Sequence, residues 1–265
     1  MLDNKKLIYI SKKVRFEIIK QTYLKQSGHL GGALSCTDII VNILNNYIFN
    51  QINNKFVLSK GHCALALYSV LYNAKKLNTN DFLSFAKKGS VFGEHPSPQI
   101  KNKYICFSTG SLGHGLGFAS GIAYSNFLKK KKDKVFVLMS DGEMNSGSVW
   151  ESALLSSKLN LKNLIAIIDY NKFQATGKSN DIMNIKPLSA KWKSFGWNVL
   201  ECNGNDHISL SKCLKLISKN KEKPSIIIAH TIKGKGVSFM ENDNNWHYRA
   251  PTKEELKLSK KELKI

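Results

Sequence analysis

The chain has 265 residues, a length that suits one large α/β domain, although two small domains fit the length as well. A hydrophobic fraction of 42% is ordinary for a globular protein and argues against a disordered chain. No apolar run reaches about 18 residues, so we expect no membrane span. The five cysteines are odd in number and lack C-x-x-C spacing, a pattern typical of buried thiols in a reducing cytoplasm.

The net charge of +21 raises the question of a nucleic-acid partner. Arg15 and Arg249 are the only arginines, so 40 − 2 = 38 of the basic residues are lysines. Base reading and bidentate phosphate binding rely on arginine. The lysines are also dispersed, apart from a run at 129–134. We therefore expect no nucleic-acid partner.

Apolar periodicity predicts helices and strands that alternate along the chain. A helix at 5–26 is followed by a glycine-rich turn, Gly28–Gly32, and then by a second helix that Ser35 or Thr37 caps and that runs through Leu44. The elements expected after these are a strand at 56–58, a helix at 61–71, a short helix at 79–88, a loop at 89–103, a glycine-rich segment at 110–117, a helix at 118–127, a strand at 135–139, a helix at 148–158, a strand at 164–168, a helix at 187–195, a strand at 198–200, a helix at 208–219, a strand at 225–229 and a charged helical tail from about 251. This order predicts a mostly parallel, doubly wound α/β sheet in a single domain, 1–265.

Two of the expected strands end in side chains that carry oxygen ligands. Asp141 follows one strand and Asn171 follows the next, 171 − 141 = 30 residues later. Ligands of open parallel sheets bind beyond the carboxyl ends of the strands. A carboxylate, an amide oxygen and a nearby backbone carbonyl would hold Mg²⁺ and leave room for diphosphate oxygens. Either residue alone would be interpreted as part of a turn, but the pair at matching strand ends favours the metal.

Asp-Gly followed about 30 residues later by Asn resembles the signature of thiamine diphosphate enzymes. Around it, seven motifs resemble those of transketolases in the same order, and they extend over nearly the whole chain. They are SGHLGGALSCTDIIVNIL, FVLSKGHCALALYSVLY, GEHPS, STGSLGHGLGFASGIA, DGEMNSGSVWESALLSSKLNLKNLIAIIDYNKFQATG, KWKSFGW and HTIKGKGV…WH. The chain resembles the N-terminal subunit of split transketolases, which implies the thiamine diphosphate-binding (PP-type) fold.

The resemblance also implies ligands for the metal and the diphosphate. Asp141, Asn171 and the carbonyl of Phe173 match the Mg²⁺ ligands of the family. Gly142 matches the position at which the backbone approaches the diphosphate, where a Cβ would interfere. His62 matches a histidine on the diphosphate side.

Further positions match the cofactor and substrate channel. Gly110 and Leu112 resemble the stretch that passes along thiamine diphosphate, and His247 resembles a histidine shared by cofactor and sugar. His29 and His95 resemble histidines of the substrate channel, and imidazole moves protons near neutral pH. Taken alone, each histidine has the alternative of a loop residue satisfied by backbone. The glycine-rich stretch at 233–236 is expected to be a loop over the active site, with neither of its lysines assigned as a ligand.

The implied reaction is transfer of a two-carbon ketol unit from a ketose phosphate to an aldose. The pyrimidine-binding domain of the family has no counterpart in these motifs, and only a short charged tail follows residue 250. The resemblance and the length together therefore imply a partner, a C-terminal transketolase subunit, in a cytoplasmic α₂β₂ assembly.

Three alternatives remain open on the sequence. The chain could act on an unusual sugar in a carbohydrate biosynthesis pathway, such as that of a surface polysaccharide. The α subunit of a 2-oxo acid dehydrogenase shares the metal signature but lacks the GHLGG and SKGH motifs. A non-catalytic scaffold subunit is supported by Ser140 and Ser146, which stand where the family has Gly and Glu, but the retained metal and histidine positions oppose it.

Overall fold

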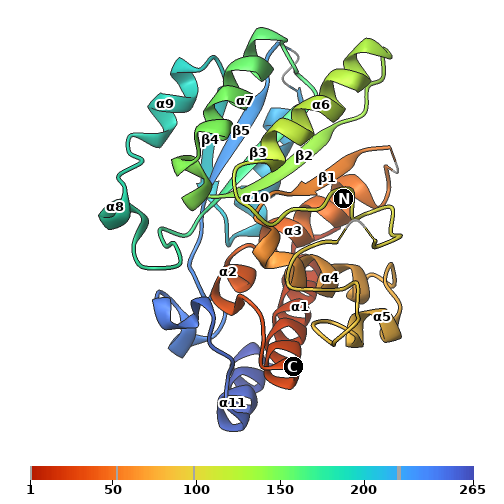
Figure 1. Cartoon of the computed structure of the whole chain (residues 1–265), viewed down its shortest axis with the longest axis vertical. Helices are drawn as coiled ribbons and strands as arrows, with labels where there is room; N and C mark the ends of the chain where they lie inside the picture. The colour runs from red at the N-terminus through yellow and green to blue at the C-terminus, as the bar shows by residue number, and fades with distance from the viewer. Residues whose placement is uncertain (1, 52, 98, 220–221) are drawn as a thin grey trace.

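The computed structural model describes residues 2–51, 53–97, 99–219 and 222–265. Within these ranges the chain forms a five-stranded sheet in the order β1-β2-β3-β5-β4, and every pairing is parallel. The strands are β1 Lys55–Leu58, β2 Val135–Ser140, β3 Leu164–Tyr170, β4 Asn198–Asn203 and β5 Ser225–His230. Helices lie on both faces of the sheet (Figure 1). The predicted parallel, doubly wound sheet is confirmed.

The helices follow the predicted alternation. They are α1 Asn4–Lys25, α2 Leu30–Ser35, α3 Thr37–Ile43, a π-helical turn Leu44–Ile48, a 3₁₀ turn Gly61–Cys63, α4 Ala64–Asn73, α5 Thr79–Leu83, α6 Gly115–Leu128, a 3₁₀ turn Gly142–Asn145, α7 Gly147–Lys158, α8 Ser179–Ile182, α9 Leu188–Ser194, α10 His207–Lys219, 3₁₀ turns Ser238–Met240 and Asn244–His247, and α11 Lys253–Leu263. The helix expected at 79–88 ends early because the chain turns at Ala86, which has a φ of +52°. Among the described residues, no helix combines the length and apolar content needed to cross a membrane.

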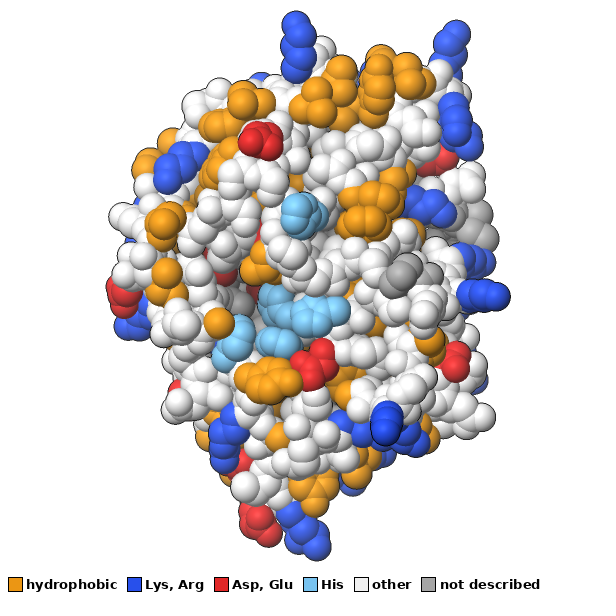
Figure 2. Space-filling model, viewed as in Figure 1, with side chains coloured by type: hydrophobic (Ala, Val, Ile, Leu, Met, Phe, Trp, Pro, Cys, Tyr) orange, Lys and Arg blue, Asp and Glu red, His pale blue; other side chains and the backbone are white. Residues whose placement is uncertain are grey.

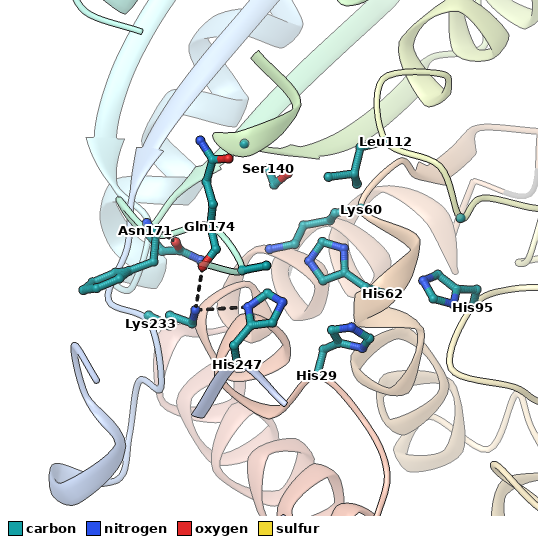
Figure 3. Close-up of a pocket in the computed structure, with 15 residues that line it drawn as sticks. His29, Lys60, His62, His95, Leu112, Ser140, Asn171, Gln174, Lys233 and His247 are labelled. Atoms are coloured by element: carbon teal, nitrogen blue, oxygen red, sulfur yellow. Dashed lines mark hydrogen bonds between the residues drawn. The ribbon is translucent and has the colours of Figure 1, made fainter. Parts of the chain in front are cut away.

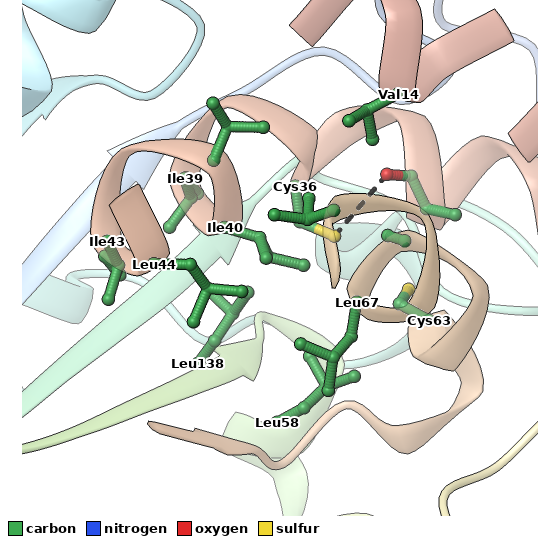
Figure 4. Close-up of a cluster of buried hydrophobic side chains, with 14 of the residues drawn as sticks. Val14, Cys36, Ile39, Ile40, Ile43, Leu44, Leu58, Cys63, Leu67 and Leu138 are labelled. Atoms are coloured by element: carbon green, nitrogen blue, oxygen red, sulfur yellow. Dashed lines mark hydrogen bonds between the residues drawn. The ribbon is translucent and has the colours of Figure 1, made fainter. Parts of the chain in front are cut away.

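Alternate side chains of each central strand enter two different cores. In β2, Phe136 and Leu138 pack with the helices on one face, and Val137 packs with the helices on the other. Figure 4 shows the first core, where Leu138 lies near Ile40 and neighbouring apolar side chains. Burial on both faces explains why these strands are continuous apolar runs in the sequence. It also places the carboxyl ends of the strands at one edge of the sheet.

The glycine-rich segment before α2 is a turn only in its first part. Gly28 has a φ of +127°, but α2 begins at Leu30 and includes the next two glycines. A Cβ on Gly31 would lie 2.9 Å from the carbonyl oxygen of Trp246. Gly31 therefore serves close packing inside a helix, which the sequence pattern did not distinguish from a turn.

The predicted caps of the second helix are wrong. The residue before α3 is Cys36, and its side chain forms no cap hydrogen bond. The Ser35 hydroxyl instead donates to Asp169 Oδ2 at 2.6 Å, and the Thr37 hydroxyl donates to the Ala33 carbonyl at 2.9 Å. Ser35 is thereby part of the polar network beneath the cavity described below.

The charged C-terminal segment is helical, as predicted. A capping box between Thr252 and Glu255 begins α11, and Leu263 near its end is buried. Of the five free cysteines, Cys106 is half-buried and the other four are buried, in line with the prediction of buried thiols.

Two glycines of α6 differ in the space around them. A Cβ on Gly115 would lie 2.4 Å from Ser59 Cβ, whereas no described atom lies within 4 Å of a Cβ on Gly121. We expect Gly115→Ala to lower the free energy of unfolding by about 1–3 kcal/mol through overpacking. Gly121→Ala should raise it by up to about 1 kcal/mol, because alanine favours the helix. Urea denaturation of both variants tests this difference, and equal effects would contradict it.

Candidate active site

A cavity of about 270 Å³ opens at the carboxyl ends of the strands (Figure 3). Nine of the ten residues predicted for the site line it: His29, His62, His95, Gly110, Leu112, Gly142, Asn171, Phe173 and His247. The tenth, Asp141, is fully buried and adjoins the lining residues Ser140 and Gly142. The segments that carry these residues are far apart in sequence, and the parallel sheet brings them to one place.

Asp141 and Asn171 follow the ends of the adjacent strands β2 and β3, as predicted. The Asp141 carboxylate accepts hydrogen bonds from the backbone N–H of Gly142 at 3.0 Å and the hydroxyl of Ser179 at 2.8 Å. Burial is the main reason why the pKa of Asp141 is raised to about 6. Asn171 Oδ1 accepts from the backbone N–H of Phe173 at 3.0 Å, which fixes the orientation of the amide.

These residues fit a bound Mg²⁺ ion. Within the described ranges, no Lys, Arg or His lies within ion-pairing distance of the Asp141 carboxylate. A fully buried carboxylate without a counter-charge is unfavourable unless a cation joins it. The side-chain oxygens of Asp141 and Asn171, with the Phe173 carbonyl, are hard oxygen donors of the type that Mg²⁺ takes together with phosphate oxygens.

A buried ion pair lies beside this group and was missed in the sequence. Lys60 and Asp169 are both almost completely shielded from solvent, and their side chains form an ion pair. Burial opposes the charge on Lys60, but Asp169 and the neighbouring Cys63 and Cys36 together outweigh burial and raise the pKa of Lys60 well above its ordinary value. Asp169 also accepts a hydrogen bond from Thr231 Oγ1 at 2.5 Å. A lysine between a strand and a glycine usually indicates a surface turn. The position of Lys60 within the SKGH motif was therefore the only sequence feature that connected it with the site.

Lys233 is a second lysine that the sequence left unassigned. It is 1% exposed and lines the cavity, where its ammonium donates to Asn244 Oδ1 at 2.5 Å and lies 3.1 Å from His247 Nδ1. Burial, followed by the charge of Lys60, lowers the pKa of Lys233 to about 8. Its neighbour in the motif, Lys235, pairs with Glu241 and is about one third exposed. Of the two lysines in the glycine-rich loop, Lys233 is therefore buried at the cavity and Lys235 is a partly exposed member of an ion pair.

The four predicted histidines gather around His29. Its ring centroid lies 5.3 Å from that of His62, 5.9 Å from that of His95 and 5.4 Å from that of His247. Burial, and then the neighbouring His62, lowers the pKa of both His29 and His95. Figure 2 shows histidine side chains gathered near the middle of this face of the molecule. The lowered pKa of His29 and His95 favours neutral rings, which can both donate to and accept from hydroxyl groups.

His247 should titrate far below an ordinary histidine. Burial, followed by the charge of Lys233, lowers the pKa of His247 to about 4. We expect an NMR titration of its ring to show a midpoint near this value, and Lys233→Met to raise it. Because the unfolded histidine binds its proton more tightly, this group lowers stability as the pH falls from about 6.5 towards 4. A midpoint near 6.5 would contradict the geometry.

Glu143 is a further carboxylate that sequence reasoning missed. It is fully buried and accepts hydrogen bonds from the backbone N–H groups of Gly113 at 3.0 Å and Ser140 at 2.8 Å. Burial raises the pKa of Glu143 above its ordinary value. It therefore ties the loop before α6 to the end of β2. Ser146 packs beside Gly113 as well.

The parallel α/β sheet, with a polar cavity and a fitted cation site at its carboxyl edge, defines a cofactor-binding α/β protein. The family model described as "Transketolase, thiamine diphosphate binding domain" matches residues 6–265, and the chain belongs to this family. Its domain type binds thiamine diphosphate. The family membership and the fold predicted from the seven motifs are thereby confirmed.

Two curated relatives and one solved structure illustrate the similarity. A subunit of the apulose-4-phosphate transketolase of Phocaeicola vulgatus is 34% identical, over 96% of this chain and 92% of the relative. Its counterpart from Actinobacillus succinogenes is 38% identical, over 89% and 88%. The crystal structure of transketolase from Campylobacter jejuni superimposes with a TM-score of 0.92 at 24% identity. The match covers 100% of this chain and 43% of the Campylobacter jejuni chain. The chain thus spans less than half of that solved transketolase.

Proposed function

We propose that this chain is the thiamine diphosphate-binding subunit of a two-chain transketolase, which moves a two-carbon ketol unit from a ketose phosphate to an aldose. The observation that supports this most is the assembly of one cavity from a fitted Mg²⁺ site and four histidines. A scaffold subunit would not need a buried Asp141 without an ion-pair partner among the described residues. In this proposal Asp141, Asn171 and the Phe173 carbonyl would hold Mg²⁺, which would supply positive charge for the diphosphate.

The chain's own residues have two kinds of role in the cavity. Gly142 leaves space for the diphosphate, and Lys233, beside His247, supplies a positive charge. Burial lowers the pKa of His29, His95 and His247, which favours neutral rings that both donate to and accept from sugar hydroxyls. When bound, thiamine diphosphate supplies the chemistry that breaks and forms the carbon–carbon bond.

A partner chain belongs to this proposal. The chain spans about nine tenths of two relatives that are each named as one subunit of a transketolase, but 43% of a solved transketolase. We propose that a C-terminal subunit carrying the pyrimidine-binding domain completes the site, in a cytoplasmic α₂β₂ assembly. His62, Gly110 and Leu112, which line the cavity, then lie along the cofactor between the two chains.

The names of the relatives also favour an unusual substrate. Both are named for apulose 4-phosphate. We propose a ketose phosphate of this kind as the donor, rather than a common pentose phosphate.

The test is purification of the tagged chain with its partner from its own cells, in the presence of Mg²⁺ and thiamine diphosphate. We expect the complex to transfer a ketol unit from a panel of ketose phosphates that includes apulose 4-phosphate, and the chain alone to be inactive. A complex that binds the cofactor but transfers no ketol unit from any donor would overturn the proposal and favour a scaffold or a different reaction.

A further inference from the structure

The side-chain amide of Asn171 is held at both of its ends. Its Oδ1 accepts from the backbone N–H of Phe173 at 3.0 Å, and its Nδ2 donates to the hydroxyl oxygen of Ser35 at 3.1 Å. Nδ2 also lies 3.4 Å from Asp169 Oδ2. Asn171 is 4% exposed and lines the cavity, whereas Ser35 and Asp169 are fully buried. The amide at the cavity is therefore tied to a polar group inside the protein.

The acceptors around Ser35 decide the direction of its hydrogen bond with Asn171. The Ser35 hydroxyl carries one proton, and its oxygen lies 2.6 Å from Asp169 Oδ2 and 2.9 Å from the carbonyl oxygen of Gly32. Both of these atoms accept, since the Asp169 carboxylate is paired with the ammonium of Lys60. The hydroxyl proton is used there, so the Ser35 oxygen can only accept from Asn171. The group of Asn171 that faces Ser35 must therefore be the NH₂ group.

This direction places the amide oxygen of Asn171 on the side where a metal ion would bind. The Phe173 N–H, which can only donate, requires the same orientation from the other end. A flipped amide would direct N–H groups at the cation and at the Phe173 N–H. Its oxygen would then face a Ser35 hydroxyl that has no proton left to donate. The orientation that presents a metal ligand is thus the one that satisfies every hydrogen bond.

We propose that Ser35 is a positioning residue for Mg²⁺, because its hydroxyl fixes the Asn171 amide with the oxygen towards the cation. Asp169 anchors this hydroxyl, and it is itself held by Lys60 at Oδ2 and by Thr231 at Oδ1. Lys60 and Asn171 lie at the same cavity (Figure 3). Residues that hydrogen-bond to a metal ligand typically contribute about 10–100-fold to metal affinity.

This inference rests on the magnesium site of the proposed function and extends it to a residue of α2 that does not line the cavity. It gives the buried pair of Lys60 and Asp169 a role in metal binding besides its role in stability. It also gives a functional reason why the Ser35 hydroxyl bonds to Asp169 and does not cap a helix.

The test is a calorimetric titration of Mg²⁺ into the purified complex with its partner, freed of metal and saturated with thiamine diphosphate. We expect Ser35→Ala to lower the affinity for Mg²⁺ about tenfold, because the Asn171 amide loses the acceptor that holds its NH₂ group. At saturating Mg²⁺ the variant should keep the wild-type kcat for ketol transfer. The loss should be confined to the Mg²⁺ concentration that gives half of the maximal rate.

Three further substitutions separate the orientation of the amide from a general loosening of the site. Thr37→Val removes a buried hydroxyl that donates to the Ala33 carbonyl, and it should leave the affinity for Mg²⁺ unchanged. Thr231→Val removes the donor to the other oxygen of Asp169, so it should weaken Mg²⁺ binding less than Ser35→Ala does. Ser35→Cys keeps a weak acceptor in the same place and should lie between Ser35→Ala and the wild type. It replaces Ser35→Ala in the comparison if that variant does not fold.

The outcomes separate the two proposals. If the wild-type complex binds no Mg²⁺ in the presence of thiamine diphosphate, the magnesium site fails and the role of Ser35 fails with it. If the wild type binds Mg²⁺ and the Ser35 variants bind it equally tightly, the positioning role is wrong and the proposed function stands. A loss of affinity in Thr37→Val or Thr231→Val as large as that in Ser35→Ala would also overturn the inference, because the orientation of Asn171 would then not be the cause.

Discussion

Asp141→Asn should abolish Mg²⁺-dependent binding of thiamine diphosphate while making the metal-free protein more stable. Asp141 is fully buried and has no ion-pair partner among the described residues. The amide removes an unfavourable buried charge but also a metal ligand. Mutation of a residue that only hydrogen-bonds to a metal ligand typically lowers metal affinity about 10–100-fold. Loss of a direct ligand should therefore lower the affinity for Mg²⁺ by at least about 100-fold.

Thermal unfolding with and without Mg²⁺ and thiamine diphosphate measures both effects. The wild-type complex should gain stability from the two additions by mass action, and the Asp141→Asn complex should gain none. Asp181→Asn, which is exposed in α8, is the matched control and should behave as the wild type. A variant that keeps the ligand-induced rise in Tm would show that the metal does not bind at Asp141.

Lys60→Met should lower the free energy of unfolding by about 3–5 kcal/mol, the usual consequence of leaving one member of a buried ion pair uncompensated. The substitution leaves the carboxylate of Asp169 buried without its cation. Adding Asp169→Asn to this variant should recover much of the loss, because no charge then remains. Of the two hydroxyls that now donate to separate oxygens of Asp169, those of Ser35 and Thr231, one can still donate to the amide oxygen and the other can rotate to accept from the amide N–H.

Urea denaturation of the two single variants and the double variant forms a complete cycle. Lys235→Met breaks a pair that is about one third exposed, so its effect should stay within about 1 kcal/mol. If the losses of unfolding free energy in the two single variants simply add in the double variant, Lys60 and Asp169 do not stabilise each other as a buried ion pair.

The sheet could be predicted from the sequence because its strands are buried on both faces. The run from Val135 to Met139 admits no polar residue, and the same holds for Leu164 to Ile168. Such runs separated by helical spacing leave few arrangements other than a parallel sheet. The positions of Asp141 and Asn171 followed from this, since the carboxyl ends of parallel strands share one edge.

Other features depend on contacts between distant segments. The burial of Lys60 and Lys233 is decided by Asp169 and by the packing of the last loop, which no local pattern reveals. The hydroxyl of Ser35 was expected to cap a helix but bonds to the same Asp169 instead. Gly31 looked like a turn residue because the sequence does not show that the backbone of Trp246 approaches it.

The most direct test of the account is a calorimetric titration of thiamine diphosphate, with Mg²⁺ present, into the chain alone, the partner alone and the assembled complex. We predict tight binding to the complex that EDTA abolishes, together with weak or absent binding to either chain alone. A complex that fails to bind the cofactor, or a single chain that binds it as tightly as the complex, would contradict the claim that this chain contributes the diphosphate half of a shared site.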